Sequence, residues 1–208
     1  MQKDHAFLVL AVALAGRPLA AQSASRDSVV YELLPASRLE VRTGKSGLFG
    51  FAGHEHLVRA QRFSGRVVFY RDQPAASHIT VSVPTDGLEV LTPPDTEEIR
   101  KVTAAMRGEV LDVARYPEIT LTGRTLDRTG DTLRLQAALT IKGQTRELPL
   151  AVRVDIGADT LHASASFAVK QTDFGIRPYR GGPGGTVRVA DRVTFTIDVI
   201  ALRVATPN

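Results

Sequence analysis

The 208-residue sequence contains no cysteine, no tryptophan and few aromatic residues, which make up 6% of the chain. The lack of cysteine excludes disulfides, thiolate zinc sites, iron–sulfur clusters, a cysteine nucleophile and a lipid-modified N-terminal cysteine. The net charge of +4 is small and spread along the chain, so it gives no electrostatic footprint for nucleic acid. The hydrophobic fraction of 43% is ordinary for a globular protein. We therefore expect one folded domain with a well-filled core.

Several enzyme motifs are also missing. The sequence has neither the Gly-x-Ser-x-Gly turn of serine hydrolases nor the His-Glu-x-x-His motif of zinc proteases. The Gly-Lys-Ser sequence at 44–46 lacks the glycine that opens a phosphate loop. The Asp-Phe-Gly sequence at 173–175 stands without the other protein-kinase motifs. We expect no enzymatic activity and no cofactor.

One hydrophobic run stands out, at the N-terminus. Lys3 precedes an apolar stretch over residues 6–15, and small residues including Ala20 and Ala21 follow. This order is typical of a secretory signal, and the run is too short to cross a bilayer. We predict a signal peptide over 1–21, cleaved near Ala21, with a buried N-terminal helix as the alternative. No later segment predicts a transmembrane helix, so we expect a soluble protein, periplasmic or secreted, with a domain over 22–208.

The remaining chain alternates between apolar and polar residues almost throughout. The pattern is clearest over residues 133–141, 148–156, 161–169 and 193–199. Such alternation indicates strands with one buried and one solvated face, as in antiparallel sheets. Short turn sequences join the strands, at 129–131, 142–144 and 157–159. The pattern predicts a mainly β fold, a single closed antiparallel barrel or sandwich with its core over about 29–204.

One segment follows a helical pattern instead. Asp95 and Glu98 form a capping-box arrangement, and Ile99, Val102 and Met106 fall on one helical face. We predict one short helix over about 95–107, ended by Gly108. The glycine-rich sequence 181–185 predicts a surface loop, since a strand pattern follows it.

The sequence His54-Glu55-His56 is a candidate metal site. On a strand, the imidazoles of His54 and His56 project to the same face and can ligate one ion. No third ligand is evident, because His78 and His162 are both predicted to face outward. The open alternatives are a metal-binding protein or metal-dependent enzyme, and a histidine pair that only packs at the mouth of the barrel.

Several segments form a set of motifs in sequence order. They are Gly-His-Glu-His-Leu at 53–57 with Phe-Ser-Gly at 63–65, Leu-Asp-Val-Ala-Arg-Tyr-Pro-Glu-Ile at 111–119, Leu-Thr-Ile-Lys-Gly-Gln-Thr at 139–145, Asp-Phe-Gly-Ile at 173–176, and the closing strand at 189–199. Together these motifs, which cover most of the chain from about residue 39 to 201, resemble the YceI-like family of bacterial lipid- or polyisoprenoid-binding proteins.

The resemblance implies an extended lipocalin-like antiparallel barrel around an apolar tunnel. The implied ligand is an amphiphile such as a polyisoprenoid, an isoprenoid quinone or a fatty-acyl compound, and a homodimer is a reasonable expectation. We assign the tunnel wall to Phe49, Phe51, Phe69, Val81, Leu121, Ala137, Leu139, Ala163, Ala165, Phe167, Phe174 and Phe195.

Two features of this assignment have alternatives. The phenylalanines of the N-terminal third either line the tunnel or only fill the core. Arg177 and Arg180 either bind an anionic head group, for which the planar guanidinium is suited, or are solvated loop charges. A barrel without a ligand, acting as a structural protein of the cell envelope, is a further possibility.

Overall fold

The computed structural model describes residues 28–46, 55–92, 96–181 and 187–204. The proposed signal segment, Phe49, Phe51 and His54 lie outside these residues. The strands are β1 (Ser28–Leu33), β2 (Arg38–Ser46), β3 (Leu57–Ala60), β4 (Ser64–Tyr70), β5 (His78–Pro84), β6 (Leu88–Val90), β7 (Glu118–Thr129), β8 (Thr132–Ile141), β9 (Gln144–Ile156), β10 (Thr160–Lys170), β11 (Arg180–Gly181) and β12 (Val187–Val204). The helical elements are η1 (Pro74–Ala76), η2 (Thr85–Gly87), α1 (Thr96–Ala105), η3 (Met106–Val110) and η4 (Gln171–Phe174).

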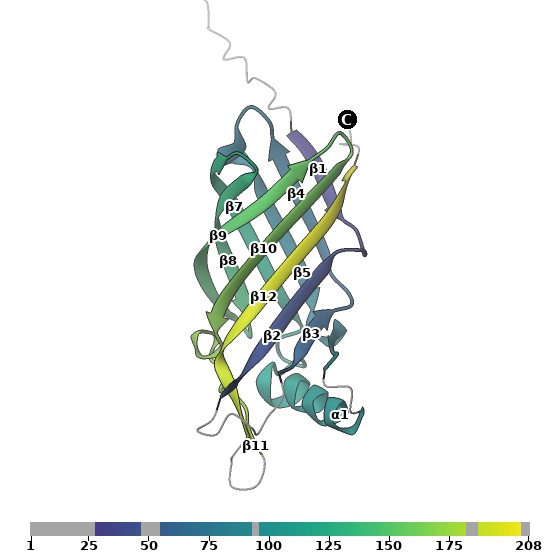
Figure 1. Ribbon diagram of the computed structural model, residues 1–208, viewed down its shortest axis with the longest axis vertical. Helices are drawn as coiled ribbons and strands as arrows, with labels where there is room; N and C mark the ends of the chain where they lie inside the picture. Colours follow the sequence, from purple (N-terminus) through teal and green to yellow (C-terminus); the bar gives the residue numbers. More distant parts are fainter. Residues whose placement is uncertain (1–27, 47–54, 93–95, 182–186, 205–208) are drawn as a thin grey trace, which may run out of the picture.

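The sheet closes into an antiparallel barrel. Its strands pair in the order β1-β4-β5-β7-β8-β9-β10-β12, and β12 pairs with β1 to complete the circle of eight strands (Figure 1). This confirms the predicted mainly β fold with one short helix. The shape follows from the residue pattern. On β8 every inward residue from Leu133 to Ile141 is buried, while the outward Arg134 is exposed. Closure gives each of these apolar faces a common interior.

The hairpin between β8 and β9 shows how local sequence fixes the register. Lys142 and Gly143 both have positive φ, of 50° and 72°, as a tight two-residue hairpin turn requires. A Cβ added to Gly143 would lie 2.9 Å from Cε1 of Tyr116. Glycine is therefore needed here both for the backbone conformation and for the close approach of the tyrosine ring.

Short breaks interrupt three neighbouring strand paths of the barrel wall. On one side of the breaks β1, β4 and β5 form this part of the wall, and on the other side β2, β3 and β6 form it. The breaks separate β1 from β2, β3 from β4 and β5 from β6. At the first break the Ser37 hydroxyl donates to the carbonyl of Ile200 and accepts from its N–H, each at 3.0 Å. The Leu34 N–H also donates to the Ile200 carbonyl at 2.8 Å, so the hydroxyl mainly supplies an acceptor for the Ile200 N–H at the break. Beyond the breaks the wall continues as β12-β2-β3-β6, and α1 lies beside it at that end (Figure 1).

The helix differs from its prediction at its C-terminal end. It covers Thr96–Ala105 and then widens into a π-helical turn, η3, that contains Gly108. The N–H of Leu111 donates to the carbonyl of Met106 at 2.9 Å, which is the i to i+5 bond of a π-turn. The wider turn places both Met106 and Leu111 in the core. The predicted cap Asp95 lies outside the described residues.

One end of the barrel, where β1 begins and β12 ends, holds a buried cluster. Tyr31, Phe69, Leu161, Val199 and Ala201 form one buried cluster there, with exposures of 5% or less. Phe69, which the sequence assigned to the tunnel wall, lies in this cluster and is not among the residues that line the cavity. On the paired strands β4 and β1, Phe69 lies opposite Val29, two residues from Tyr31.

Candidate functional site: an apolar cavity in the barrel

A cavity of about 230 Å³ lies inside the barrel. Its wall is built from inward-facing residues of β2, β3, β5 to β10 and β12, together with η3 and the segment from η4 to Ile176. Only Glu40, Thr43, Ser164 and Gln171 of the lining residues are polar. A cavity lined almost wholly by aliphatic and aromatic side chains offers water few partners and favours an apolar occupant.

Most of the described residues that the sequence predicted for the tunnel do lie together in its wall. These are Val81, Leu121, Leu139, Ala163, Ala165, Phe167, Phe174 and Phe195. Ala137 does not line the cavity. It faces inward and is 1% exposed, but it is packed among Leu133, Leu135 and Leu150. Alternation shows which face is inward and not how far the cavity extends, so the sequence could not place Ala137 outside the wall.

Two small residues are followed by two larger ones along the β10 side of the cavity. Ala163 and Ala165 line it with single methyl groups, while Phe167 is followed by Val169. The ring of Phe167 stacks on that of Phe195, its direct partner on β12, with centroids 5.0 Å apart. The alanines leave space that larger side chains would fill, and the stacked rings give a flat apolar surface next to it.

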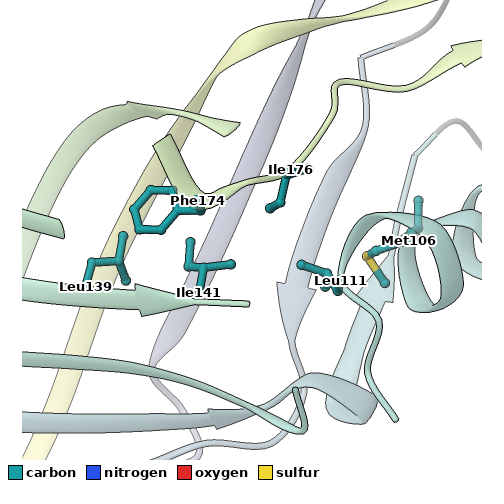
Figure 2. Packing of buried hydrophobic residues seen from close by; sticks show 7 residues of the cluster. Met106, Leu111, Leu139, Ile141, Phe174 and Ile176 are labelled. Carbon is teal, nitrogen blue, oxygen red and sulfur yellow. The ribbon is translucent and has the colours of Figure 1, made fainter. Parts of the chain in front are cut away.

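The other end of the cavity is bounded by a second buried cluster, shown in Figure 2. Phe174 lies against Leu139 and Ile141 of β8, and Met106 of η3 and the following Leu111 lie on the opposite side. The sequence assignment missed Met106, Val110, Leu111 and Ile176 as lining residues. The stripe of Ile99, Val102 and Met106 was the available signal, because an amphipathic helix must bury its apolar face against something.

Hydrogen bonds attach η4, and with it Phe174, to β12. The backbone N–H and the hydroxyl of Thr172 donate to the carboxylate of Asp191 at 2.9 and 2.8 Å. The buried Gln171 side chain donates to the Ala190 carbonyl at 2.8 Å. The Thr172 N–H is the main reason that the pKa of Asp191 lies below its usual value of 3.8, with a smaller contribution from Lys170.

We expect this attachment to weaken at low pH. Because folding lowers the pKa of Asp191, its contribution is complete above about pH 3.8 and is lost as the pH falls through the lowered value. Asp191→Asn should lower the free energy of unfolding by a few tenths to about 1 kcal/mol at neutral pH, and by less near pH 3. Thermal melts from pH 7 to pH 3 measure the difference. Asp198→Asn, on the same strand, is the control, and a pH-independent gap between Asp191→Asn and the unmodified protein would contradict the expectation.

The two candidate head-group arginines do not reach into the cavity. Arg177 and Arg180 are both exposed, and neither lines the wall. Arg177 directly follows Ile176, which is a lining residue, so its backbone stands at the boundary between cavity and solvent. Arg180 belongs to β11, which pairs with the start of β12. The structure therefore brings Arg177 to the edge of the site.

The described residues give the histidine pair no metal site. His56 is 9% exposed, and its Nδ1 donates to the carbonyl of Thr92 at 2.9 Å. No group of three or more His, Asp or Glu side chains in the described parts of the chain is arranged to hold a metal ion. His54 lies outside those parts. The backbone hydrogen bond explains the burial of the His56 ring without a ligand.

An eight-stranded antiparallel barrel that encloses an apolar cavity defines a lipocalin-like class of protein. Within the described residues, no helix has the length and apolar character needed to cross a membrane. The model of the YceI-like domain matches residues 37–201. The chain belongs to the YceI-like family.

Individual relatives are distant. Protein YceI of Salmonella newport is 26% identical over 135 residues, which are 61% of this chain and 68% of that protein. Protein YceI of Salmonella arizonae is 26% identical over 92 residues, only 45% of its length. Among solved structures, Burkholderia cenocepacia BcnA has a TM-score of 0.64 at 17% identity, covering 84% of this chain and 99% of that one. A polyisoprenoid binding domain from Saccharophagus degradans has a TM-score of 0.62 at 12% identity, covering 84% and 98%. These structural likenesses establish the fold.

Proposed function

We propose that this protein binds the apolar chain of an amphiphile inside its barrel. The observation that carries the proposal is the cavity, whose wall is almost entirely aliphatic and aromatic. Removing apolar area from water stabilises a complex by roughly 25 cal/mol per Å², so a long hydrocarbon chain needs few polar contacts. The ligand class we favour is a polyisoprenoid, an isoprenoid quinone or a fatty-acyl compound. One structural neighbour is named as a polyisoprenoid binding domain, which supports the first of these.

The role that fits this site is carriage or storage of the ligand, or stress protection, without catalysis. The described lining contains no nucleophile with an adjacent base and no pair of carboxylates, since Glu40 is its only acidic residue. Glu40 itself is paired with Arg59, with Nε donating to Oε1 at 2.8 Å. A carrier needs an apolar cavity and a route by which the ligand enters it. The described residues can form both.

We further propose that the protein works after export, in the periplasm or outside the cell. The N-terminal signal pattern supports this location, and the lack of cysteine is compatible with an oxidising compartment because no thiol can mispair there. An anionic head group would lie outside the cavity, where Arg177 is exposed beside the lining residue Ile176. Association into a homodimer is part of the same proposal.

The decisive experiment is extraction of the protein purified from its native host. Organic extraction followed by lipid mass spectrometry should recover an isoprenoid or fatty-acyl compound in an amount comparable with the protein. N-terminal sequencing of the same sample should show a mature chain beginning near residue 22. Protein purified under mild conditions and yielding no lipid would contradict the binding proposal, and an intact N-terminus on exported protein would contradict the cleavage.

A further inference from the structure

The wall of the barrel is incompletely paired between β9 and β10. The two strands pair from Leu161 with Ile156 down to Ser164 with Arg153, and no further. Both strands continue well beyond that point, and both lie wholly within the described residues. We call the boundary between residues 144–152 of β9 and 165–170 of β10 the β9–β10 seam.

The neighbouring pairings show that the seam is a local feature. On the other side of β9, the ladder with β8 runs from Ile141 with Gln144 to Thr132 with Arg153. On the other side of β10, the ladder with β12 covers the full length of β10. Pairing with β8 therefore holds β9 in place, and pairing with β12 holds β10 in place. The described pairings leave the edges of β9 and β10 that face each other without a ladder along the seam. Pro149 fits this arrangement, since proline has no N–H to donate and is tolerated on strand edges.

The cavity lies directly behind the seam. Its lining includes Leu150 and Val152 from the β9 side and Ala165, Phe167 and Val169 from the β10 side. Over residues 148–152 of β9 and 165–169 of β10 the inward-facing side chains are all apolar, while Gln144 and Arg146 hold the inward register positions nearer the β8–β9 turn. A hydrocarbon chain that passed between the strands would move from solvent into the cavity without crossing a polar layer of side chains.

The outer margins carry charge at Glu147 and Lys170, both away from the paired end of the seam, and none between them and that end. Pro149 and Ala151 face outward on β9, and Ser166 and Ala168 face outward on β10. Where the two strands do pair, the outward positions include charged residues such as Arg153. Burial of an unpaired charge under a passing chain is costly, so small uncharged side chains lower the barrier to passage at the seam.

The seam is bounded at both ends. Its closed end is the pair of Ser164 with Arg153. At the other end η4 contacts β9, and Phe174 packs on Leu139 and Ile141 (Figure 2). Because the far end of the barrel is a solid cluster around Tyr31, access along the barrel axis from that side is blocked.

We propose that the β9–β10 seam is a lateral portal through which the hydrocarbon chain of the ligand enters the cavity. The inference rests on the proposed function and adds a route to it. A sideways entry lets a long chain slide between two strand edges along its length, so the chain does not have to thread through an end of the barrel. No ladder joins residues 144–152 of β9 to residues 165–170 of β10, so these segments can separate without breaking a ladder between them.

The experiment closes the seam with a crosslink. The native chain has no cysteine, so Ala151→Cys/Ser166→Cys introduces the only two thiols, at the next outward positions that an extended β9–β10 register would pair. A bis-maleimide with a cleavable disulfide spacer joins them after folding. Association of farnesol carrying a dansyl group is followed by stopped-flow fluorescence. Thr140→Cys/Thr145→Cys, bridged in the same way across the intact β8–β9 ladder, is the matched control.

We expect the seam crosslink to slow association by about tenfold or more, to slow dissociation comparably and to leave the equilibrium affinity nearly unchanged. Cleavage of the spacer should restore the rate, and the control crosslink should have no effect. An association rate unchanged by the seam crosslink would overturn the portal alone. A protein that takes up no probe even without a crosslink would overturn the proposed function and the portal together.

Charge offers a second test that needs no chemical modification. Ala151→Arg/Ser166→Arg places two cations on the outer margins of the seam and should slow association several-fold. Thr194→Arg/Thr196→Arg places the same charges outward on β12, one strand away. Equal rates in the two variants would count against the portal.

Discussion

Replacement of Phe174 by alanine should lower the free energy of unfolding by about 3–5 kcal/mol. The side chain is 1% exposed and lies against Leu139 and Ile141 in the cluster that bounds the cavity (Figure 2). Its removal deletes a full aromatic contact surface and leaves a void that joins the existing cavity. Urea denaturation followed by circular dichroism gives the free energy and tests for a two-state transition.

The matched control is Phe167→Ala. Phe167 is half-buried because one side of its ring faces the cavity, so fewer contacts are lost and we expect a smaller change. The conservative variant Phe174→Leu should recover much of the lost stability. A loss below about 1 kcal/mol for Phe174→Ala would mean that the cluster does not close this end of the barrel.

Filling the cavity should have the largest effect on binding. Ala165→Phe places an aromatic ring in the space beside Phe167 and Phe195, which the ligand chain would otherwise occupy. We expect the affinity for the dansyl-farnesol probe to fall at least about tenfold, or 1.4 kcal/mol. Fluorescence titration measures the affinity, and thermal melts should show a change in stability of no more than about 1–3 kcal/mol.

Ala138→Phe is the control for this prediction. Ala138 lies on the outward face of β8, so the variant adds the same ring without entering the cavity. We expect it to bind the probe as the unmodified protein does. If Ala165→Phe and the unmodified protein bound the probe with equal affinity, the ligand would have to bind elsewhere. If both variants lost affinity equally, the added ring would be acting by destabilising the fold and not by filling the cavity.

Much of the barrel could be predicted because its information is local. The alternation on β8 assigned each residue from Leu133 to Ile141 to the correct face, and the turn at Lys142 and Gly143 fixed its pairing with β9. The capping and apolar stripe after Asp95 located α1 within a few residues. In each case the preference for the strand, turn or helix depends on residues that are close together in the chain.

The site was predicted only in part for a physical reason. Inward-facing residues look alike in sequence whether they meet a packed core or an empty space, so Phe69 and Ala137 were assigned to the cavity and belong to the core. The contribution of Met106 and Leu111 depends on a π-turn whose apolar residues meet β8 from a distant part of the chain.

The sequence by itself determined that this protein is a cysteine-free antiparallel barrel of the YceI-like family, because alternation, turn residues and family motifs are all local patterns. Only the tertiary structure decided where the barrel is solid, where it is hollow and where its wall is unpaired. The solid and hollow parts depend on which distant side chains meet across the interior. The unpaired wall depends on β9 and β10 diverging beyond the pair of Arg153 with Ser164, although both continue as strands. Packing volume and strand divergence are properties of the closed barrel, and no single segment encodes them.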